Sequence, residues 1–180
     1  MSGNNHKIIF TGPVGAGKTT AISAISDIPV LKTDENAQDM TKKRKQTTTV
    51  AMDYGLLNLG DGERIHLYGT PGQERFDFMW EILTQGGLGL ILLLDNSRPD
   101  PFKDMQFFVN SFSDFISDKK MVVGITHMEN NPAPTIETYH HHLKKHDIKA
   151  PVLEVDARKK EDIETLLKVL LYSLDPWLGK

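Results

Sequence analysis

The chain contains Gly12-Pro13-Val14-Gly15-Ala16-Gly17-Lys18-Thr19, a stretch that fits the pattern GxxxxGK(S/T) at every required position. The apolar run Lys7-Ile8-Ile9-Phe10 predicts a strand before it, and residues 20–25 after it have the spacing of a helix with one buried face. The bare pattern also occurs by chance, so the order strand, glycine-rich loop, helix is what makes the match specific. The alternative interpretation is an ordinary glycine-rich turn followed by an exposed lysine.

Each residue type in this stretch suits the binding of a phosphate chain. Glycines let the backbone N–H groups turn inward, where a side chain would block the phosphates. The helix that begins near Gly17 adds its positive end, Lys18 supplies an ammonium for the β- and γ-phosphates, and the hydroxyl of Thr19 can ligate Mg²⁺. The residues predicted to bind nucleotide here are Gly12, Pro13, Val14, Gly15, Ala16, Gly17, Lys18, Thr19 and Thr20.

Composition limits the class of protein. With 180 residues and 39% hydrophobic content, the chain can form one domain with a substantial core, so we expect a single domain over residues 1–180. The net charge of −3 gives no indication of a nucleic-acid partner or of an anionic membrane surface. The chain has no cysteine, which excludes disulfides and thiolate metal sites and is compatible with the cytoplasm.

No stretch of the sequence predicts attachment to a membrane. The first residues are polar, and the longest apolar run, residues 88–94, is far shorter than the ~20 residues that span a bilayer. Neither end carries a lipidation motif. We therefore expect a cytoplasmic protein without a direct membrane anchor.

Strand and helix patterns alternate along the rest of the chain. The expected strands are residues 50–59 and 64–68, which form a hairpin, and residues 87–95, 121–125 and 151–155; the expected helices are residues 101–116, 135–146 and 161–174. This alternation predicts an α/β fold with a doubly wound, mostly parallel six-stranded sheet and one antiparallel hairpin strand. Ligands of such sheets bind at the carboxyl ends of the strands, where the glycine-rich loop also lies.

Three further segments have features of their own. Residues 31–49 are polar without a strand or helix period and are expected to be mobile; the basic run at residues 41–45 is either a solvated loop or a patch for a phosphate or partner. In the aromatic helix at residues 76–83, Phe76, Phe78 and Trp80 cannot all point inward, so Phe78 and Trp80 are candidates for a partner surface. The histidines at positions 140–142 and 146 share a helix face, but without further ligands we interpret them as solvated or partly packed.

The chain resembles the small Ras-like GTPases in three features: the glycine-rich loop, the threonines before the second strand, and Gly69-Thr70-Pro71-Gly72-Gln73. The similarity covers nearly the whole chain. Within that family it looks closest to the bacterial branch of MglA-type polarity switches and GTPases encoded beside roadblock-domain proteins, by the run at residues 45–55 and the phrase at residues 69–73. The resemblance implies a small G-domain that binds GTP or GDP with Mg²⁺.

The resemblance also implies roles for single residues. Thr49 would close onto Mg²⁺ and the γ-phosphate, with Thr48 as the alternative, because a switch threonine of the family has the same spacing to the following glycine. Gly72 would donate its amide to the same phosphate, and Gln73 would orient the attacking water. The predicted catalytic residues are Lys18, Thr49 and Gln73, and the predicted metal ligands are Thr19 and Thr49.

Two departures from the family concern the phosphate end. Gly69 stands where most members have an aspartate that holds the water shell of the metal; Asp53 and Asp95 are conceivable substitutes, and we select neither. Val14 stands where many relatives have glycine, close to where the catalytic glutamine must fit, which predicts slow hydrolysis. A stabilising arginine would come from a partner, or from Arg44 or Arg75, for both of which a solvent-facing position is the commoner explanation.

A third departure concerns the base. Where the family has Asn-Lys-x-Asp, this chain has Thr126-His127-Met128-Glu129: Glu129 has the right charge one methylene too far out, His127 could stack on the base, and Thr126 is not expected to bridge as an asparagine amide does. Asp156-Ala157-Arg158 takes the place of the family's Ser-Ala-Lys, so the Ala157 amide could meet the carbonyl oxygen of guanine. We expect GTP in preference to ATP.

The leading hypothesis is a slow GTP-driven switch in which residues 31–49 and 69–83 respond to the γ-phosphate and present a surface to a partner. That partner would be a GTPase-activating or effector protein; a roadblock-domain partner and a role in polarity or surface motility are implied by resemblance only. The alternatives are a nucleotide-dependent binding module without useful hydrolysis, and an ATP-specific NTPase. A P-loop kinase is disfavoured because the chain after residue 86 offers no arginine-rich lid.

Overall fold

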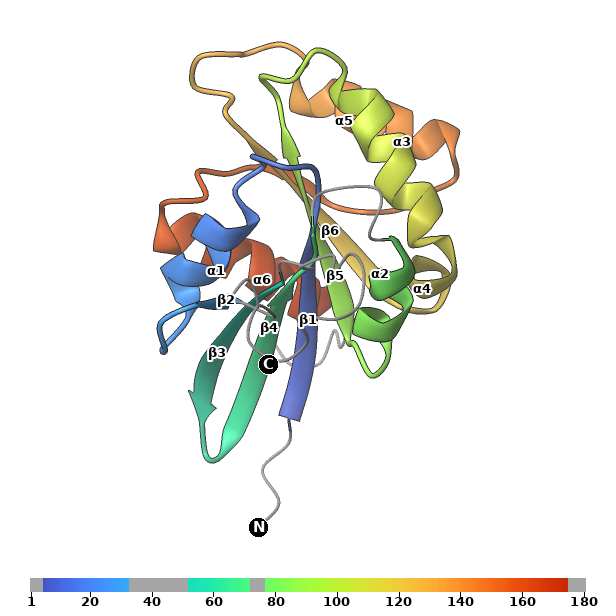
Figure 1. Cartoon of the computed structure of the whole chain (residues 1–180). Coiled ribbons are helices and arrows are strands. Elements are labelled where there is room, and N and C mark those ends of the chain that lie inside the picture. Colours follow the sequence, from blue (N-terminus) through green and yellow to red (C-terminus); the bar gives the residue numbers. More distant parts are fainter. Residues whose placement is uncertain (1–4, 33–51, 72–76, 175–180) are drawn as a thin grey trace, which may run out of the picture.

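The computed structural model describes residues 5–32, 52–71 and 77–174, apart from the side chains of residues 77–79. Within them, helices cover both faces of a central sheet (Figure 1). The strands are β1 (Asn5–Thr11), β2 (Leu31–Lys32), β3 (Asp53–Gly60), β4 (Glu63–Gly69), β5 (Gly89–Asp95), β6 (Lys120–Thr126) and β7 (Val152–Glu154). The helices are α1 (Lys18–Ile25), α2 (Asp77–Thr84), α3 (Pro101–Ser111), α4 (Ser113–Asp118), α5 (Ile136–Lys145) and α6 (Lys160–Leu174).

The sheet has the strand order β2-β3-β4-β1-β5-β6-β7. The strands from β4 to β7 are parallel to one another, and β3 is antiparallel to both of its neighbours, which confirms the predicted α/β, mostly parallel sheet with one reversed hairpin strand. The predicted number of six strands is wrong, because the described residues form seven. The additional strand, β2, consists of two residues that pair with the first two residues of β3. A strand of two residues is too short to be predicted from an alternation of side chains.

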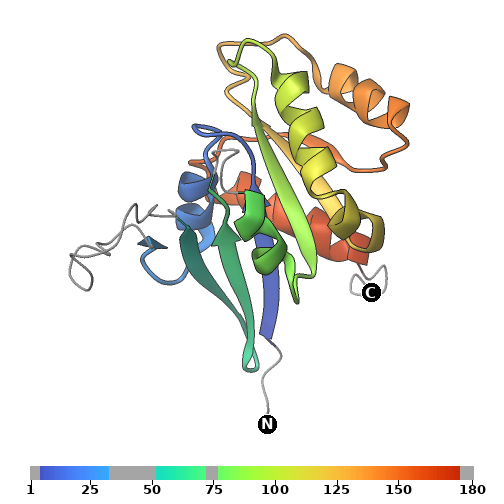
Figure 2. The same ribbon diagram turned by 45° about the vertical axis from the view of Figure 1, so that its right-hand side comes forward.

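The alternation of side chains along β1 divides the core into two layers. Ile8 and Phe10 face α1 and α6, whereas Ile9 faces the layer of α2, α3 and α5. Figure 2 shows these helices as two layers on either side of the sheet. All seven residues of β5 are buried, as the continuous apolar run predicted for a strand covered on both faces. β5 therefore carries Asp95, at its carboxyl end, to the same edge of the sheet as the loop that follows β1.

The predicted helix at residues 101–116 is two helices, α3 and α4, that meet at Phe112. Asp100 begins α3, since its carboxylate accepts a hydrogen bond from the backbone N–H of Lys103 and Pro101 occupies the first turn. The backbone of Phe112 leaves helical geometry, with φ −104° and ψ 14°, while its ring stays buried. Apolar spacing alone did not reveal this break, because Phe115 and Ile116 of α4, which are partly buried, pack against the same cluster as the buried residues of α3.

Trp80 on α2 is a core residue, with an exposed fraction of 2%. Its ring stacks on Phe112 at a centroid distance of 5.1 Å and also contacts Phe107 and Phe108. The prediction that Trp80 contributes to a partner surface is therefore wrong, since α3 supplies an aromatic cluster that the sequence of α2 alone could not indicate. The ring of Phe78 lies outside the described residues. Among the side chains of α2 that the structure describes, the exposed apolar one is Ile82, at 59%.

The histidine-rich helix α5 packs by one of its histidines. The ring of His142 stacks on Phe102 with centroids 4.0 Å apart, and burial is the main cause that lowers the pKa of His142. This contact agrees with our interpretation of a partly packed helix face. Across the three described ranges, no helix is both long and apolar enough to cross a membrane.

Candidate nucleotide site

The loop after β1 has the backbone of a phosphate cradle. Gly12, Gly15 and Gly17 have positive φ angles of 141°, 84° and 98°. A Cβ at Gly12 would lie 2.0 Å from the carbonyl oxygen of Leu93, and one at Gly17 would lie 2.8 Å from Cβ of Ala157, so neither position tolerates a side chain. Among the described residues, no side chain caps the start of α1. Its first N–H groups are therefore available to an anion.

Lys18 lies over the mouth of this loop. Its Nζ donates hydrogen bonds to the carbonyl oxygens of Gly12 at 2.7 Å and Pro13 at 2.8 Å. Burial lowers the pKa of Lys18 from 10.5 to about 8, an effect that the charge of Asp53 opposes and the charge of Arg98 reinforces. The ammonium is therefore buried beside the loop, and no carboxylate of the described residues forms an ion pair with it, which suits an anionic ligand.

Asp53, which the sequence analysis named as a conceivable substitute without selecting it, lies at this site. The hydroxyl of Thr19 donates a hydrogen bond to Oδ2 of Asp53, and Asp53 pairs with Gly69 across the β3–β4 ladder. A Cβ added at Gly69 would lie 3.1 Å from Cβ of Asp53 and 3.3 Å from Oδ2. The carboxylate of Asp53 thus occupies the space beside Gly69, where a side chain at position 69 would begin.

The donors at this point suit a hard divalent cation. Mg²⁺ prefers carboxylate, hydroxyl and phosphate oxygens, and Thr19 and Asp53 supply a hydroxyl and a carboxylate in direct contact with each other. Asp95 does not share this position, because its Oδ1 accepts hydrogen bonds from the backbone N–H of Ser97 at 2.8 Å and lies 3.1 Å from Nδ1 of His127. Of the two conceivable substitutes for the missing aspartate, only Asp53 lies beside Thr19.

Thr126 connects β6 to the phosphate loop. Its hydroxyl lies 3.0 Å from the carbonyl oxygen of Ala16 and 3.2 Å from that of Leu94, and its side chain is buried. Thr126 therefore joins the end of β6 to the phosphate loop through its hydroxyl. That it does not bridge as an asparagine amide does stays a prediction. The short side chain suffices because Ala16 turns its carbonyl toward the end of β6. His127 follows with φ 59°, a left-handed conformation that turns the chain sharply out of the strand.

A pocket of about 210 Å³ adjoins the loop. It is lined by Gly15, Gly17, Thr20, His127, Glu129, Asp156, Ala157 and Arg158. The structure therefore brings together three segments that the sequence analysis assigned to the nucleotide: the glycine-rich loop, the turn after β6 and the turn after β7. Three hydrogen bonds from Arg158 hold the pKa of Asp156 well below its usual range.

The start of the second predicted switch segment also lies at this edge. The backbone N–H of Thr70 donates to the carbonyl oxygen of Phe10 at 2.9 Å, and the hydroxyls of Thr70 and Thr11 lie 2.8 Å apart. Residues 72–76 thus follow directly from a segment fixed beside the phosphate loop. The predicted site residues Thr49, Gly72 and Gln73, together with the arginines Arg44 and Arg75, lie outside the described residues.

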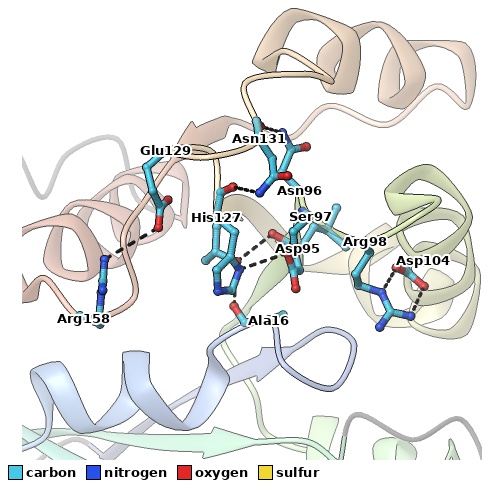
Figure 3. Close-up of polar contacts among 12 residues, drawn as sticks. Ala16, Asp95, Asn96, Ser97, Arg98, Asp104, His127, Glu129, Asn131 and Arg158 are labelled. Carbon is cyan, nitrogen blue, oxygen red and sulfur yellow. Dashed lines mark hydrogen bonds and ion pairs between the residues drawn. The ribbon is translucent and has the colours of Figure 1, made fainter.

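Arg98 is a cation near the site that the sequence analysis missed. It lies in the turn between β5 and α3, where both Nε and Nη2 donate hydrogen bonds to the carboxylate of Asp104 (Figure 3). These bonds raise its pKa, so Arg98 remains charged, and that charge reaches Lys18. The signal that could have found it is its position three residues after the end of a buried parallel strand.

Comparison with known proteins yields a matching family and several relatives. A family model described as "Conserved hypothetical ATP binding protein" matches residues 29–147, which is more than half of the chain and begins after the glycine-rich loop. The uncharacterized protein MJ1339 of Methanocaldococcus jannaschii is 30% identical over 125 residues, which cover 69% of this chain and 70% of that protein.

Two relatives of another kind are more distant. The Ras-related protein RabC of Dictyostelium discoideum is 22% identical over 178 residues, 94% of this chain and 84% of the relative. The Ras-related protein Rab-8A of Gallus gallus is 28% identical over 123 residues, 66% of this chain and 54% of the relative. The match to RabC extends over the glycine-rich loop as well as the region of the family model.

Proposed function

We propose that this chain, which belongs to the family described as conserved hypothetical ATP-binding proteins, is a guanine-nucleotide switch. Its distant homology to the Ras and Rab small GTPases supports the proposal. The chain binds GTP or GDP with Mg²⁺ in a single small G-domain over residues 1–180 and hydrolyses GTP slowly. The observation that carries the proposal is the glycine-rich loop, with three positive φ angles and the buried ammonium of Lys18 over its mouth.

The phosphate chain binds by electrostatics. The backbone N–H groups of residues 14–19 surround the β- and γ-phosphates, and Lys18 exchanges its bonds to loop carbonyls for bonds to phosphate oxygens. Thr19 and Asp53 are the described residues that would hold Mg²⁺, which when bound neutralises charge on the β- and γ-phosphate oxygens. In this proposal Asp53 takes the place of the aspartate that most small Ras-like GTPases have at the position of Gly69.

Hydrolysis depends on residues outside the described ranges. Gln73 orients the attacking water, Gly72 donates its N–H to the γ-phosphate, and Thr49 adds a second threonine ligand to the metal. Loss of the γ-phosphate releases the segments that carry Thr49 and Gln73, which changes the surface offered to a partner. The hydrogen bond between Thr70 and Phe10 supports this role. Phe10 lies on β1, the strand that leads into the phosphate loop, and Gly72 follows Thr70 by two residues in the sequence.

The pocket that Glu129, Ala157 and Arg158 line, called the base-side pocket below, supports guanine rather than adenine as the base. The carboxylate of Glu129 can accept hydrogen bonds from N1–H and the 2-amino group of guanine, and the backbone N–H of Ala157 can donate to its carbonyl oxygen. Adenine would set its N1 acceptor against the carboxylate, leaving polar groups unpaired at a cost of about 1–3 kcal/mol each. ATP is the second candidate, because the description of the matching family names it.

The nucleotide released on denaturation of the purified full chain tests this proposal. Chromatography should detect GDP or GTP, whereas ADP or ATP would overturn the guanine assignment. The Lys18→Ala variant should release none and should bind none in titrations. Lys145→Ala on the exposed face of α5 is the matched control, because it removes a lysine far from the loop. Nucleotide binding that survives Lys18→Ala would overturn the site itself.

The cellular role is proposed on resemblance. A GTPase-activating or effector protein, of which a roadblock-domain protein is one kind, would recognise the triphosphate state, and membership of the MglA-type branch would imply a role in polarity or surface motility. Cytoplasmic location and the lack of a membrane anchor belong to the same proposal. Recombinant roadblock-domain proteins, tested for binding to the GTP-loaded and GDP-loaded chain, distinguish a nucleotide-dependent partner from none.

A further inference from the structure

Glu129 lines the base-side pocket; hydrogen bonds hold the backbone of its loop, whereas its side chain is largely exposed. The loop after β6 is held by Asn96, whose amide donates to the carbonyl oxygens of Asn131 at 2.6 Å and Pro134 at 3.0 Å. Asn131 in turn donates from its amide to the carbonyl oxygen of His127 at 3.1 Å. Glu129 lies within this loop, and its side chain is 52% exposed. Three rotatable bonds separate its carboxylate from that rigid backbone, so the backbone alone does not orient it.

Arg158, across the pocket, is held much more tightly. Asp156 accepts three hydrogen bonds from it: from the backbone N–H at 3.0 Å, from Nε at 2.8 Å and from Nη2 at 2.7 Å. The backbone N–H of Asp156 donates to Oδ2 of Asp162 at the start of α6, at 2.8 Å. The guanidinium is planar and two of its nitrogens are engaged by one carboxylate, so Asp156 orients Arg158 even though its side chain is 72% exposed.

The two side chains meet at the mouth of the pocket. Nη2 of Arg158 lies 3.8 Å from Oε1 of Glu129, and Figure 3 shows the side chains pointing toward each other from opposite sides. Both residues line the same pocket as Ala157 and the glycine-rich loop. Glu129 therefore has one cation within ion-pair distance among the described residues, and that cation is the fixed one.

We propose that Arg158, oriented by Asp156, is a positioning residue that directs the carboxylate of Glu129 at the base and so sets the preference for guanine. This inference rests on the proposed function, since it concerns the base of the same nucleotide. A carboxylate has about four acceptor positions, so one oxygen can face Arg158 while others accept from N1–H and the 2-amino group of guanine. The longer side chain of Glu129 needs such a guide.

The experiment compares three diphosphates on the full chain: GDP, inosine diphosphate, which lacks the 2-amino group, and ADP. Dissociation constants from titration calorimetry give the ratios of affinity between the bases. In Arg158→Ala, the affinity for inosine diphosphate, which keeps N1–H, should fall by less than the affinity for GDP. The preference for GDP over ADP should fall by about fivefold or more, while ADP itself binds within about twofold of the wild type. Arg64→Ala, which removes an exposed arginine on β4, should leave both values unchanged.

Two further variants separate positioning from a general structural role. Glu129→Gln should lose the same preference, and adding Arg158→Ala to it should have no further effect, because the guide then has nothing to orient. Asp156→Asn should give a partial loss, since it weakens the bonds that fix the guanidinium. Arg158→Lys should also fall between wild type and Arg158→Ala, because a lysine keeps the charge and loses the fork.

The outcomes distinguish this inference from the proposed function. A wild type that prefers GDP, with the same preference in Arg158→Ala, overturns the positioning role and leaves the guanine switch intact. Tighter GDP binding in Arg158→Ala also overturns it, because the ion pair would then compete with the base. A wild type that prefers ADP or binds no nucleotide overturns both.

Discussion

Asp53 faces Gly69 across the β3–β4 ladder, and its carboxylate accepts a hydrogen bond from the hydroxyl of Thr19. The carboxylate of Asp53 on β3 thus occupies the space beside Gly69 on β4, which has no side chain to fill it. Because Thr19 directly follows the lysine of the glycine-rich loop, this pair joins the hairpin to the phosphate end of the site. The relationship has a direct consequence for the metal.

Asp53→Asn should weaken Mg²⁺ binding in the nucleotide complex by about tenfold, because the substitution removes the negative charge and keeps the shape. GDP affinity measured in excess chelator should stay nearly unchanged, since the phosphate loop is intact. Asp61→Asn, at the exposed tip of the hairpin where φ is 48°, is the control. Equal Mg²⁺ dependence in Asp53→Asn and wild type would remove Asp53 from the metal site.

Lys18 makes nucleotide binding sensitive to pH. Its pKa of about 8 lies below the ordinary 10.5, so the folded chain releases a proton that the unfolded chain keeps between these values. Stability of the free protein should therefore rise as pH increases from about 8 toward 10.5. A phosphate chain requires the charged ammonium, so affinity should fall, by up to about tenfold per pH unit above pH 8.

Tripolyphosphate, which has no base to titrate, is the ligand for this measurement, followed by calorimetry between pH 7 and 9. Lys18→Arg keeps its charge throughout that range and should bind with a flat pH profile, whatever its absolute affinity. An equally steep decline in Lys18→Arg would assign the pH dependence to another group.

Thr126→Val should lower the free energy of unfolding by about 1–2 kcal/mol, because it leaves the buried carbonyl oxygen of Ala16 without its hydroxyl donor at nearly constant volume. Thr126→Ser retains the hydroxyl and should recover most of the loss. Urea unfolding monitored by circular dichroism measures both. Because the bond fixes the phosphate loop, GDP affinity should decline in Thr126→Val more than in Thr126→Ser. Identical stability of the two variants would contradict the bridge.

The local parts of this architecture were predictable and the register was not. Residue types alone indicated the phosphate loop, because Gly12 and Gly17 have no room for a side chain. Asp53 was named but could not be selected over Asp95, because the ladder shifts by one residue between Asn58 and Gly60. Without that bulge Asp53 would face Thr70 instead of Gly69. No periodicity within a strand reveals a bulge in its pairing.

The second feature that local sequence did not predict is which side chain of α2 is buried. The spacing of Trp80 and Ile82 does not say which of them meets the aromatic cluster of α3, because that depends on how two helices pack. The contact of Thr126 with the phosphate loop was not predictable for a related reason: it depends on where the carbonyl of Ala16 points. In both instances the partner residue comes from a distant part of the chain.

These two residues on α2 give a stability test. Trp80→Ala should lower the free energy of unfolding by about 3–5 kcal/mol, because it opens a cavity among three phenylalanine rings. Ile82→Ala should change it by less than about 0.5 kcal/mol, since Ile82 is exposed. Thermal and urea unfolding measure the difference between two variants of one helix. Comparable losses in the two would mean that α2 packs differently.

Val14 tests the source of slow hydrolysis. Its side chain is 58% exposed at the tip of the phosphate loop, so Val14→Gly should leave stability and GDP affinity nearly unchanged. Removal of the isopropyl group opens space beside the γ-phosphate for Gln73 and its water, and single-turnover GTP hydrolysis should become faster by about threefold or more. Adding Gln73→Leu should return the rate to the background level. If neither substitution alters the rate, Gln73 has no part in hydrolysis, and the nucleotide-dependent binding module becomes the better account of this chain.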